Sequence, residues 1–363
     1  MSEPGQDKTA YRRMVETAFA QSVPLSAQFE ITYRCNHLCT FCYNSPTGQR
    51  ELQTGGIFEI LQKISDFGVL YLTLTGGEPL CHRDFYKIAG EVRRLGMALR
   101  IYTNGYLMSD PKVMEKIIAL KPAEVEISIH GARPESHEAM TKIKGSFEKT
   151  VKAIELLSEA GQKLMLKCPV TRLNQDELFE VKEIGERANT FVTFDTVITP
   201  RDDGDQGPLS LRPTDEFLER YWAEDFIKLH NGRLPPRADH CAPEGTEAVC
   251  GAGRTGFTVD PYGNMYPCVA LRRKIGNLLE IDTIEEIWKH SPVLNQVRGL
   301  GVEARDKLNQ RENGRYFTFC MGVAETQLGA PLAVYPQAET NARAVQRANK
   351  LLKIEDETGK KYA

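Results

Sequence analysis

The chain has 363 residues, enough for one large α/β domain and a smaller one. Its formal charge of -3 and pI near 6.2 give no indication of a nucleic-acid or anionic-membrane partner. The polar N-terminus and the lack of a long apolar run argue against a signal peptide or a membrane span, and nine cysteines without an export signal indicate metal or redox chemistry in a reducing cytoplasm.

Strand and helix patterns alternate along the first 200 residues. Strand-like runs occupy 28–33, 70–75, 98–103, 124–129, 163–170 and 191–197, and helical patterns occupy 57–68, 84–96, 111–120, 146–161 and 176–188. Six βα-type units in series predict a parallel sheet with right-handed crossovers. They suit a partial (β/α)6, TIM-like barrel better than a complete eight-fold barrel.

The composition changes near residue 199, where a Gly/Pro/Asp-rich loop begins. A bridging helix is predicted within 215–230, a hairpin at 256–268 with a Pro-Tyr-Gly-Asn tip, a helix near 282–290, and a surface helix with a frayed, charged end in the tail. We therefore expect an N-terminal segment (1–24), the barrel (25–200), a bridging loop and helix (201–235), a small α+β domain (236–335) and a C-terminal helix and charged tail (336–363).

Unusual residues gather where the predicted parallel strands end. The stretch 35–42, with three cysteines in eight residues, follows the first strand, and TGGEP (75–79) follows the second. TNG (103–105), SIHG (128–131) and VTRLN (170–174) follow or end the next three. Because ligands of parallel α/β barrels bind at the carboxyl ends of the strands, we expect one site here. A tetrahedral site bound by three soft thiolates keeps one of its four positions open.

This arrangement resembles the radical S-adenosylmethionine (SAM) superfamily, in which a C-x3-C-x2-C loop with an aromatic residue before the third cysteine follows the first strand. The resemblance implies that Cys35, Cys39 and Cys42 hold three irons of a [4Fe-4S] cluster, whose fourth iron is left for SAM. Gly76-Gly77-Glu78-Pro79 resembles the family's GGE motif, in which glycines permit close backbone approach and the acid receives the methionine ammonium. The cofactor-binding residues that the resemblance implies are Gly76, Gly77, Glu78, Pro79, Phe41, Asn104, Ser128, Arg172 and Asn174.

Simpler interpretations exist for these residues. A structural zinc knuckle would use the three cysteines with His37 or Cys81, but His37 is poorly spaced and structural zinc sites usually contain paired C-x2-C units. Ser128 and Asn174 lie at strand ends, where polar residues are often only caps.

A second cysteine group brackets the predicted hairpin. Cys250-x12-Gly-x4-Cys268 resembles the opening of the SPASM extension of radical SAM enzymes that mature peptides. The resemblance implies one auxiliary [4Fe-4S] cluster on Cys241, Cys250, Cys268 and Cys320, in a shortened SPASM or twitch-type domain from which the cysteines of a second auxiliary cluster are missing. Zinc bound by the same four thiolates would also fold such a domain, so that alternative stays open.

Two further cysteines, Cys81 and Cys168, lie outside both groups. Cys81 follows the GGEP motif, and Cys168 lies in the fifth strand, where it could point into the barrel. Each is a candidate hydrogen-atom donor or relay, as in family epimerases, and each also fits a small buried hydrophobe.

The resemblance implies reductive cleavage of SAM to a 5′-deoxyadenosyl radical that abstracts hydrogen from a substrate C–H bond. We expect a ribosomally made peptide as the substrate, with epimerisation, crosslinking, decarboxylation or excision as the outcome. A separate leader-binding protein and an external reductant of flavodoxin or ferredoxin type are expected partners. A small-molecule substrate, such as a sugar alcohol or a tetrapyrrole, is the first alternative; a non-catalytic iron–sulfur electron carrier is the second.

Overall fold

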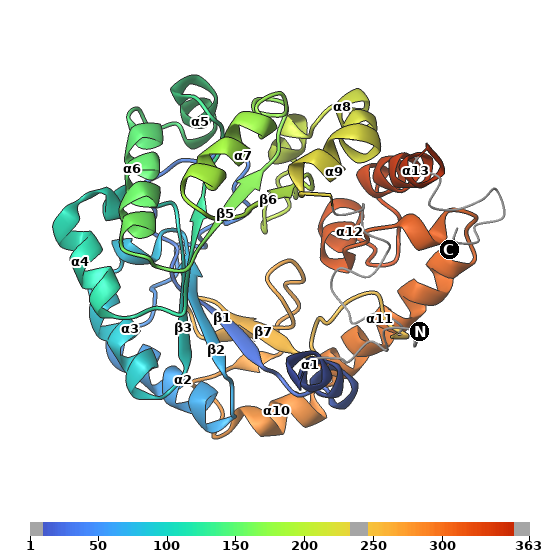
Figure 1. The fold of residues 1–363 in the computed structure, drawn as a ribbon. Coiled ribbons are helices and arrows are strands. Elements are labelled where there is room, and N and C mark those ends of the chain that lie inside the picture. Colours follow the sequence, from blue (N-terminus) through green and yellow to red (C-terminus); the bar gives the residue numbers. More distant parts are fainter. Residues whose placement is uncertain (1–9, 233–245, 352–363) are drawn as a thin grey trace, which may run out of the picture.

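The computed structural model describes residues 10–232 and 246–351, and its centre is a curved sheet of nine strands (Figure 1). The strand order is β6-β5-β4-β3-β2-β1-β7-β8-β9. The strands are β1 (Ser26–Thr32), β2 (Tyr71–Gly76), β3 (Ala98–Thr103), β4 (Glu124–Ser128), β5 (Leu164–Pro169), β6 (Val192–Asp195), β7 (Gly256–Val259), β8 (Asn264–Tyr266) and β9 (Gly276–Asn277).

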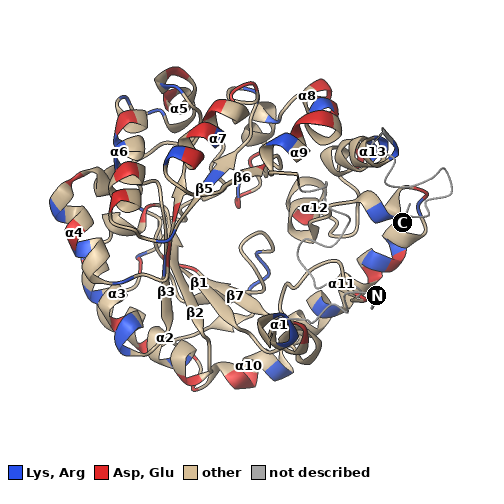
Figure 2. Cartoon of the chain, viewed as in Figure 1, with Lys and Arg blue, Asp and Glu red and all other residues tan. Residues whose placement is uncertain are grey.

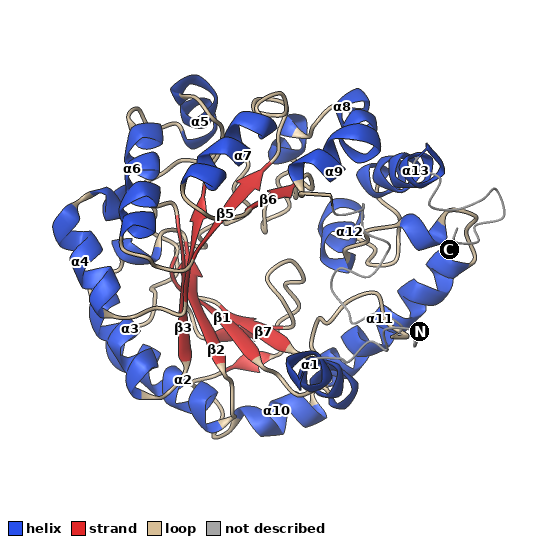
Figure 3. Ribbon diagram, in the orientation of Figure 1, coloured by secondary structure: helices blue, strands red, loops and turns tan. Residues whose placement is uncertain are grey.

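The first six strands are parallel, and helices connect them on the outside of the curved sheet (Figure 3). These helices are α2 (Thr54–Asp66), α3 (Phe85–Arg94), α4 (Pro111–Ala119), α5 (Pro134–Thr141), α6 (Ser146–Glu159) and α7 (Leu178–Arg187). The partial (β/α)6 barrel expected from the sequence is therefore confirmed. Helix α5 was not expected, because PESHEAMT lacks the apolar periodicity of a long helix.

The two faces of the barrel sheet have opposite chemistry. Because side chains alternate along a strand, every second residue faces the helices, and these are fully buried apolar residues such as Phe29, Leu74 and Ile101. The alternate residues face the inside of the barrel and are polar, among them Glu30, Glu126 and Lys167. An apolar outer face fixes the sheet against its helices and leaves the inner face available for polar contacts.

The C-terminal part continues the same sheet. Strand β7 pairs in parallel with β1, and β8 and β9 add antiparallel strands beyond it, so the predicted hairpin is joined directly to the barrel. Helices α8 and α9 follow α7 around the ring, α1 and α10 lie near β7, and α11, α12 and α13 lie across from β3 (Figure 1). Their bounds are α1 (Ala10–Gln21), α8 (Asp215–Arg220), α9 (Phe226–Leu229), α10 (Ile284–His290), α11 (Pro292–Asn309), α12 (Met321–Leu328) and α13 (Pro336–Leu351). A π-helical turn, Tyr221–Asp225, joins α8 to α9 within the predicted bridging helix.

The expectation of a surface helix in the tail was wrong for α13. Its alanines, including Ala338, Ala342 and Ala348, are almost completely buried, since small side chains allow the helix to pack closely on α8 and the π-helical turn. The indole N–H of Trp222 donates to the Asn341 side chain at 3.2 Å, which fixes this contact. Within the part of the chain that is described, no helix has the length and apolar character needed to span a membrane.

Candidate functional site

The three cysteines of the first motif lie on the loop that leaves β1. Their thiols are close enough to influence one another electrostatically, and burial raises the pKa of Cys35 to about 11. Two of the thiols accept backbone hydrogen bonds, Cys35 from the His37 N–H at 3.4 Å and Cys42 from the Asn44 N–H. Burial disfavours the thiolate form of these cysteines. Three thiolates at this loop would therefore need a bound, positively charged group such as a metal centre to stabilise them.

Helix α5 fixes the outer side of this loop. The backbone N–H of Leu38 donates to the Thr141 carbonyl and that of Thr40 to the Met140 carbonyl, both at 3.0 Å. These bonds satisfy the last carbonyls of α5, which would otherwise lack helical partners. The unexpected helix therefore positions the cysteine loop.

Orphaned polar atoms surround the cysteine loop. Among the buried side-chain atoms without a hydrogen-bond partner in the described residues, most lie on this loop or against it: Asn36 Nδ2, both ring nitrogens of His37, Asn44 Oδ1, Ser45 Oγ, His130 Nδ1 and His137 Nε2. Buried polar atoms in native proteins almost always have partners, and a concentration of exceptions indicates a missing group. The donor set therefore fits a polar, sulfur-ligated cofactor at this loop.

The described residues contain no compact group of ligands for a single metal ion. Within residues 10–232 and 246–351, no three Cys, His, Asp or Glu side chains converge closely enough to hold one metal ion. A cubane cluster places iron and sulfide between its thiolates, so its ligands lie farther apart than the four ligands of one zinc ion. A loop without a compact ligand group is therefore compatible with a cluster.

The two glycines of TGGEP lie against the backbone of the loop that leaves β1. A Cβ atom on Gly76, whose φ is +136°, would lie 2.2 Å from the Thr32 carbonyl oxygen, and one on Gly77 would lie 2.6 Å from the carbonyl oxygens of Tyr33 and Arg34. The Gly77 N–H donates to Thr32 O at 2.8 Å. These glycines therefore allow the loop after β2 to approach the loop after β1 closely.

Glu78 is buried and links the ends of β2 and β3. Its carboxylate accepts hydrogen bonds from Thr103 Oγ1 at 2.8 Å, the Asn104 N–H at 2.8 Å and the Leu80 N–H at 3.1 Å. Burial raises the pKa of Glu78 to about 7, against the opposing effect of these hydrogen bonds. Asn104 continues the chain of contacts, since its Nδ2 donates to Asn36 Oδ1 within the cysteine loop at 2.8 Å.

Of the other expected SAM contacts, Ser128 lies in the barrel and Phe41 on the cysteine loop, whereas Asn174 and Arg172 lie at the turn after β5. Ser128 faces the inside of the barrel and hydrogen-bonds Tyr102, and Phe41 packs on the His130 ring at 5.1 Å between centroids. Asn174 is buried, and its amide donates to the carbonyls of Pro169 and His130, so it closes the turn after β5. Arg172, two residues away, is exposed.

The two extra cysteines lie in different surroundings. The Cys81 thiol accepts the backbone N–H of Asn36 and lies near Cys35, and burial raises its pKa. Cys168 is fully buried on the helix-facing side of β5, opposite to Lys167, and Asn174 Nδ2 lies 3.6 Å from its sulfur. Cys168 therefore does not point into the barrel, and its position fits the alternative of a small buried hydrophobe.

The second cysteine group surrounds the hairpin at the other end of the sheet. The Gly253 N–H donates to the Pro267 carbonyl at 3.1 Å, which brings the Cys250 and Cys268 segments together. A Cβ on Gly322 would lie 2.3 Å from the Ala270 carbonyl oxygen, so the Cys320 segment also contacts the Cys268 loop. The Cys320 thiol accepts the N–H groups of Gly322 and Val323, and Cys268 accepts that of Leu271 at 3.3 Å. Cys241, the fourth expected ligand, lies outside the described residues.

Two clusters of polar residues were missed by the sequence analysis. His37, His130 and His137 pack together behind the cysteine loop, and burial lowers the pKa of His137 to about 3. On the inner face, Glu30 is completely buried and forms a bidentate ion pair with Arg272. A charged residue within the apolar run QFEITY was the available signal for Glu30. His37 and His130 lie in stretches that the sequence marked, but nothing in the sequence indicated that His137 joins them.

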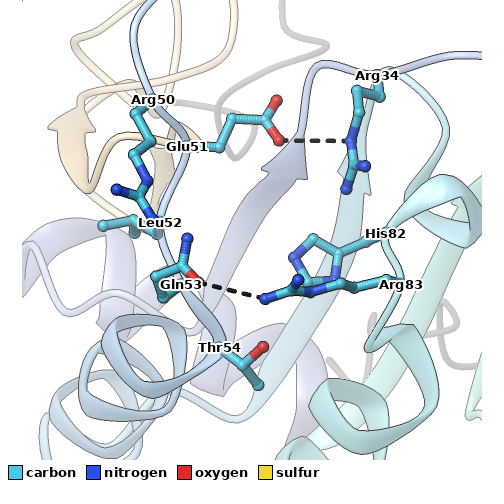
Figure 4. Close-up of a pocket in the computed structure, with 8 residues that line it drawn as sticks. All are labelled: Arg34, Arg50, Glu51, Leu52, Gln53, Thr54, His82 and Arg83. Atoms are coloured by element: carbon cyan, nitrogen blue, oxygen red, sulfur yellow. Dashed lines mark hydrogen bonds and ion pairs between the residues drawn. The ribbon is translucent and has the colours of Figure 1, made fainter.

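A pocket of about 250 Å³ lies beside the cysteine loop (Figure 4). Arg34, Arg50 and Arg83 line it from three different segments, together with His82 and Glu51, whose Oε2 lies 3.8 Å from Arg34 Nε. Arg83 reaches across the pocket and donates to the Gln53 side chain at 3.2 Å (Figure 4). Three guanidinium groups face one carboxylate in the lining, so the pocket favours anions.

Two family models match the chain. The model described as the radical SAM superfamily matches residues 29–198, and the SPASM model, an iron–sulfur cluster-binding domain, matches residues 250–320. The first match covers the barrel strands and the cysteine loop, and the second covers the hairpin with Cys250, Cys268 and Cys320.

Curated proteins similar to the chain have several substrates. The mycofactocin maturase MftC of Mycolicibacterium smegmatis is 29% identical over 289 residues, covering 76% of this chain and 72% of MftC. An AdoMet-dependent heme synthase of Methanosarcina barkeri is 26% identical, with coverage of 76% and 85%, and a PqqA peptide cyclase of Rhizobium meliloti is 27% identical, with 76% of each chain covered.

A solved structure shares the fold. Native anSMEcpe with bound AdoMet and the Cp18Cys peptide superposes with a TM-score of 0.67 at 18% identity, covering 90% of this chain and 99% of that one.

Proposed function

Because this chain belongs to the radical SAM superfamily and carries a SPASM iron–sulfur domain, we propose that it modifies a ribosomally made peptide at an unactivated C–H bond. The observation that carries the proposal is the likeness to peptide-modifying relatives along both domains. The solved neighbour with a bound peptide supports the same substrate class.

The cofactors of this family are a [4Fe-4S] cluster with one open iron, SAM, and an auxiliary cluster. In the proposal, Cys35, Cys39 and Cys42 hold the first cluster, and Cys250, Cys268 and Cys320 hold the auxiliary one together with Cys241. When bound, the first cluster and SAM supply a 5′-deoxyadenosyl radical able to take hydrogen from the substrate.

The chain's own residues bind and orient these groups. Glu78 and Asn104 connect the ends of β2 and β3 to the cysteine loop, and they are placed to fix that loop against the SAM face. Ser128 offers a hydroxyl on the inner face of the barrel, and Cys81 adds a thiol beside Cys35. A preorganised polar wall of this kind positions a cofactor without a reorganisation cost.

An acidic one-electron carrier, of flavodoxin or ferredoxin type, is proposed as the reductant. The arginine-lined pocket adjoins Cys35, since Arg34 precedes that cysteine, and it would attract carboxylates on the carrier's surface. Docking there would bring the donor near the first cluster. A separate protein that binds the leader of the peptide is also proposed.

A small-molecule substrate is the second candidate function. It is favoured by one specific observation, the likeness to an AdoMet-dependent heme synthase at an identity close to that of the peptide-modifying relatives. A polar inner face suits a tetrapyrrole carboxylate as well as a peptide side chain.

The test uses anoxically reconstituted protein with SAM and a reduced flavodoxin. Liberation of 5′-deoxyadenosine measures the radical SAM activity, and a mass change in a peptide encoded beside the gene measures the peptide activity. If deuterium from a labelled peptide never enters 5′-deoxyadenosine, while deuterium from a labelled tetrapyrrole does, the peptide proposal is refuted and the second candidate is supported.

A further inference from the structure

The loop after Cys268 enters the interior of the molecule. Residues 268–275, here called the auxiliary loop, join β8 to β9 and extend between the barrel strands and the C-terminal helices (Figure 1). Basic residues occupy this loop in an otherwise mixed interior (Figure 2). They are Arg272, Arg273 and Lys274, and the first two point to different parts of the protein.

Arg272 binds the barrel. Its two terminal nitrogens donate to the Glu30 carboxylate at 2.9 and 2.7 Å, and Glu30 lies on β1 with none of its side chain exposed. Arg272 Nε lies 3.3 Å from Asp202 Oδ2, after β6. The phenol of Tyr33 donates to the same Glu30 carboxylate at 3.0 Å, so both the pair and its surroundings are well defined.

Arg273 binds helix α12 instead of the barrel. Its guanidinium contacts Glu325 of α12 at 2.6 to 3.0 Å, and α12 begins directly after Cys320. The two arginines therefore connect one loop with β1, which leads to Cys35, and with the helix that carries Cys320.

We propose that Arg272 is a positioning residue that fixes the auxiliary loop, and with it Cys268, relative to the barrel site. Arg272 is the loop's polar contact with the barrel strands, because the hydrogen bonds of Leu271 and Ile275 return to Cys268 and Met265 within the same hairpin. Ala270 and Arg273 contact the segment of α12.

The Glu30 carboxylate accepts from both terminal nitrogens of Arg272, a bidentate contact that a lysine cannot reproduce. Asp202 adds an ion pair at Nε without a hydrogen bond. The proposal rests on the proposed function insofar as Cys268 holds an auxiliary cluster.

The main test variant is Glu30→Gln combined with Arg272→Met. Removing both charges leaves no unpaired ion at the fully buried Glu30 site, and Asp202, which loses its partner, keeps partial access to solvent, so the variant folds while the anchor is lost. Arg272→Lys is the conservative variant. Arg273→Met is the matched control, because it removes the neighbouring guanidinium without touching the barrel contact.

Hydrogen exchange of residues 268–275 is measured first, in iron-free protein. We expect exchange at least tenfold faster in the double variant, a partial return in Arg272→Lys, and no tenfold change in Arg273→Met. Unchanged exchange in the double variant would overturn the proposal. This measurement needs no cluster, so it is independent of the proposed function.

The second readout is the electron paramagnetic resonance spectrum of the auxiliary cluster, recorded in protein whose three barrel cysteines are alanine. We expect the double variant to retain its iron and to show a broadened or shifted spectrum, and Arg272→Lys to return it toward the parent spectrum. A spectrum identical to that of the parent would overturn the proposal. A parent without iron would instead refute the auxiliary cluster itself.

Discussion

Replacing Gly77 with alanine should destabilise the protein by about 3 to 5 kcal/mol. The new Cβ would lie 2.6 Å from the carbonyl oxygens of Tyr33 and Arg34, and neither backbone atom can move aside like the end of a flexible side chain. Relief of the contact would break the bonds from Gly77 N–H to Thr32 O and from Glu78 N–H to Arg34 O. Two hydrogen bonds at about 1 kcal/mol each and overpacking of about 1 to 3 kcal/mol give the total.

Urea unfolding of iron-free protein measures this effect. The matched control is Gly90→Ala in the middle of α3, where nothing lies within 4 Å of the new Cβ, so the same substitution should stabilise by about 0.5 to 1 kcal/mol. Iron content after reconstitution should fall in Gly77→Ala and stay normal in Gly90→Ala. Equal free energies of unfolding for the two variants would refute the reasoning that the glycine pair exists for loop-to-loop packing.

Three further outcomes are expected. Changing all three barrel cysteines to alanine should remove about four irons and abolish 5′-deoxyadenosine formation. Cys250→Ala with Cys268→Ala should instead lower the iron count from about eight to about four and leave SAM cleavage intact. Iron assays and chromatography of the nucleoside check both variants. Because the folded pKa of Glu78 is raised from 4.5 to about 7, the free energy of unfolding of iron-free protein should fall by about 3 kcal/mol as the pH rises through that interval, and Glu78→Gln should flatten the curve. Reversing Arg50 and Arg83 to glutamate should slow cluster reduction by flavodoxin at least tenfold without changing photochemical reduction by a small deazaflavin; equal slowing of both would argue against docking at the pocket.

Local patterns were sufficient to predict the barrel. Each strand and helix of the first 200 residues, apart from α1 and α5, carries its own apolar pattern, and the polar residues at the strand ends indicated the site. The cysteine loop was predictable for the same reason, since its chemistry lies within eight consecutive residues.

Contacts between distant segments could not be predicted. Glu30 and Arg272 are 242 residues apart, and neither position carries a mark of the other. The close backbone approach at Gly77 was predictable from its motif, but its partner was not, because the contacting carbonyls of Tyr33 and Arg34 belong to the loop that leaves β1. The face of Cys168 was left open, although it alternates with Lys167 and shares the apolar face of β5 with Leu166.

The pairing of β1 with β7 has a consequence for synthesis of the chain. Phe29 and its partner Val259 are 230 residues apart, so one edge of β1 stays open until nearly three quarters of the protein has left the ribosome. At about 5 to 20 residues per second, that interval lasts roughly 10 to 50 s. An open edge beside apolar residues is a template for pairing with other chains, so slower translation lengthens the exposure and the nascent protein depends on chaperones during this interval to avoid aggregation.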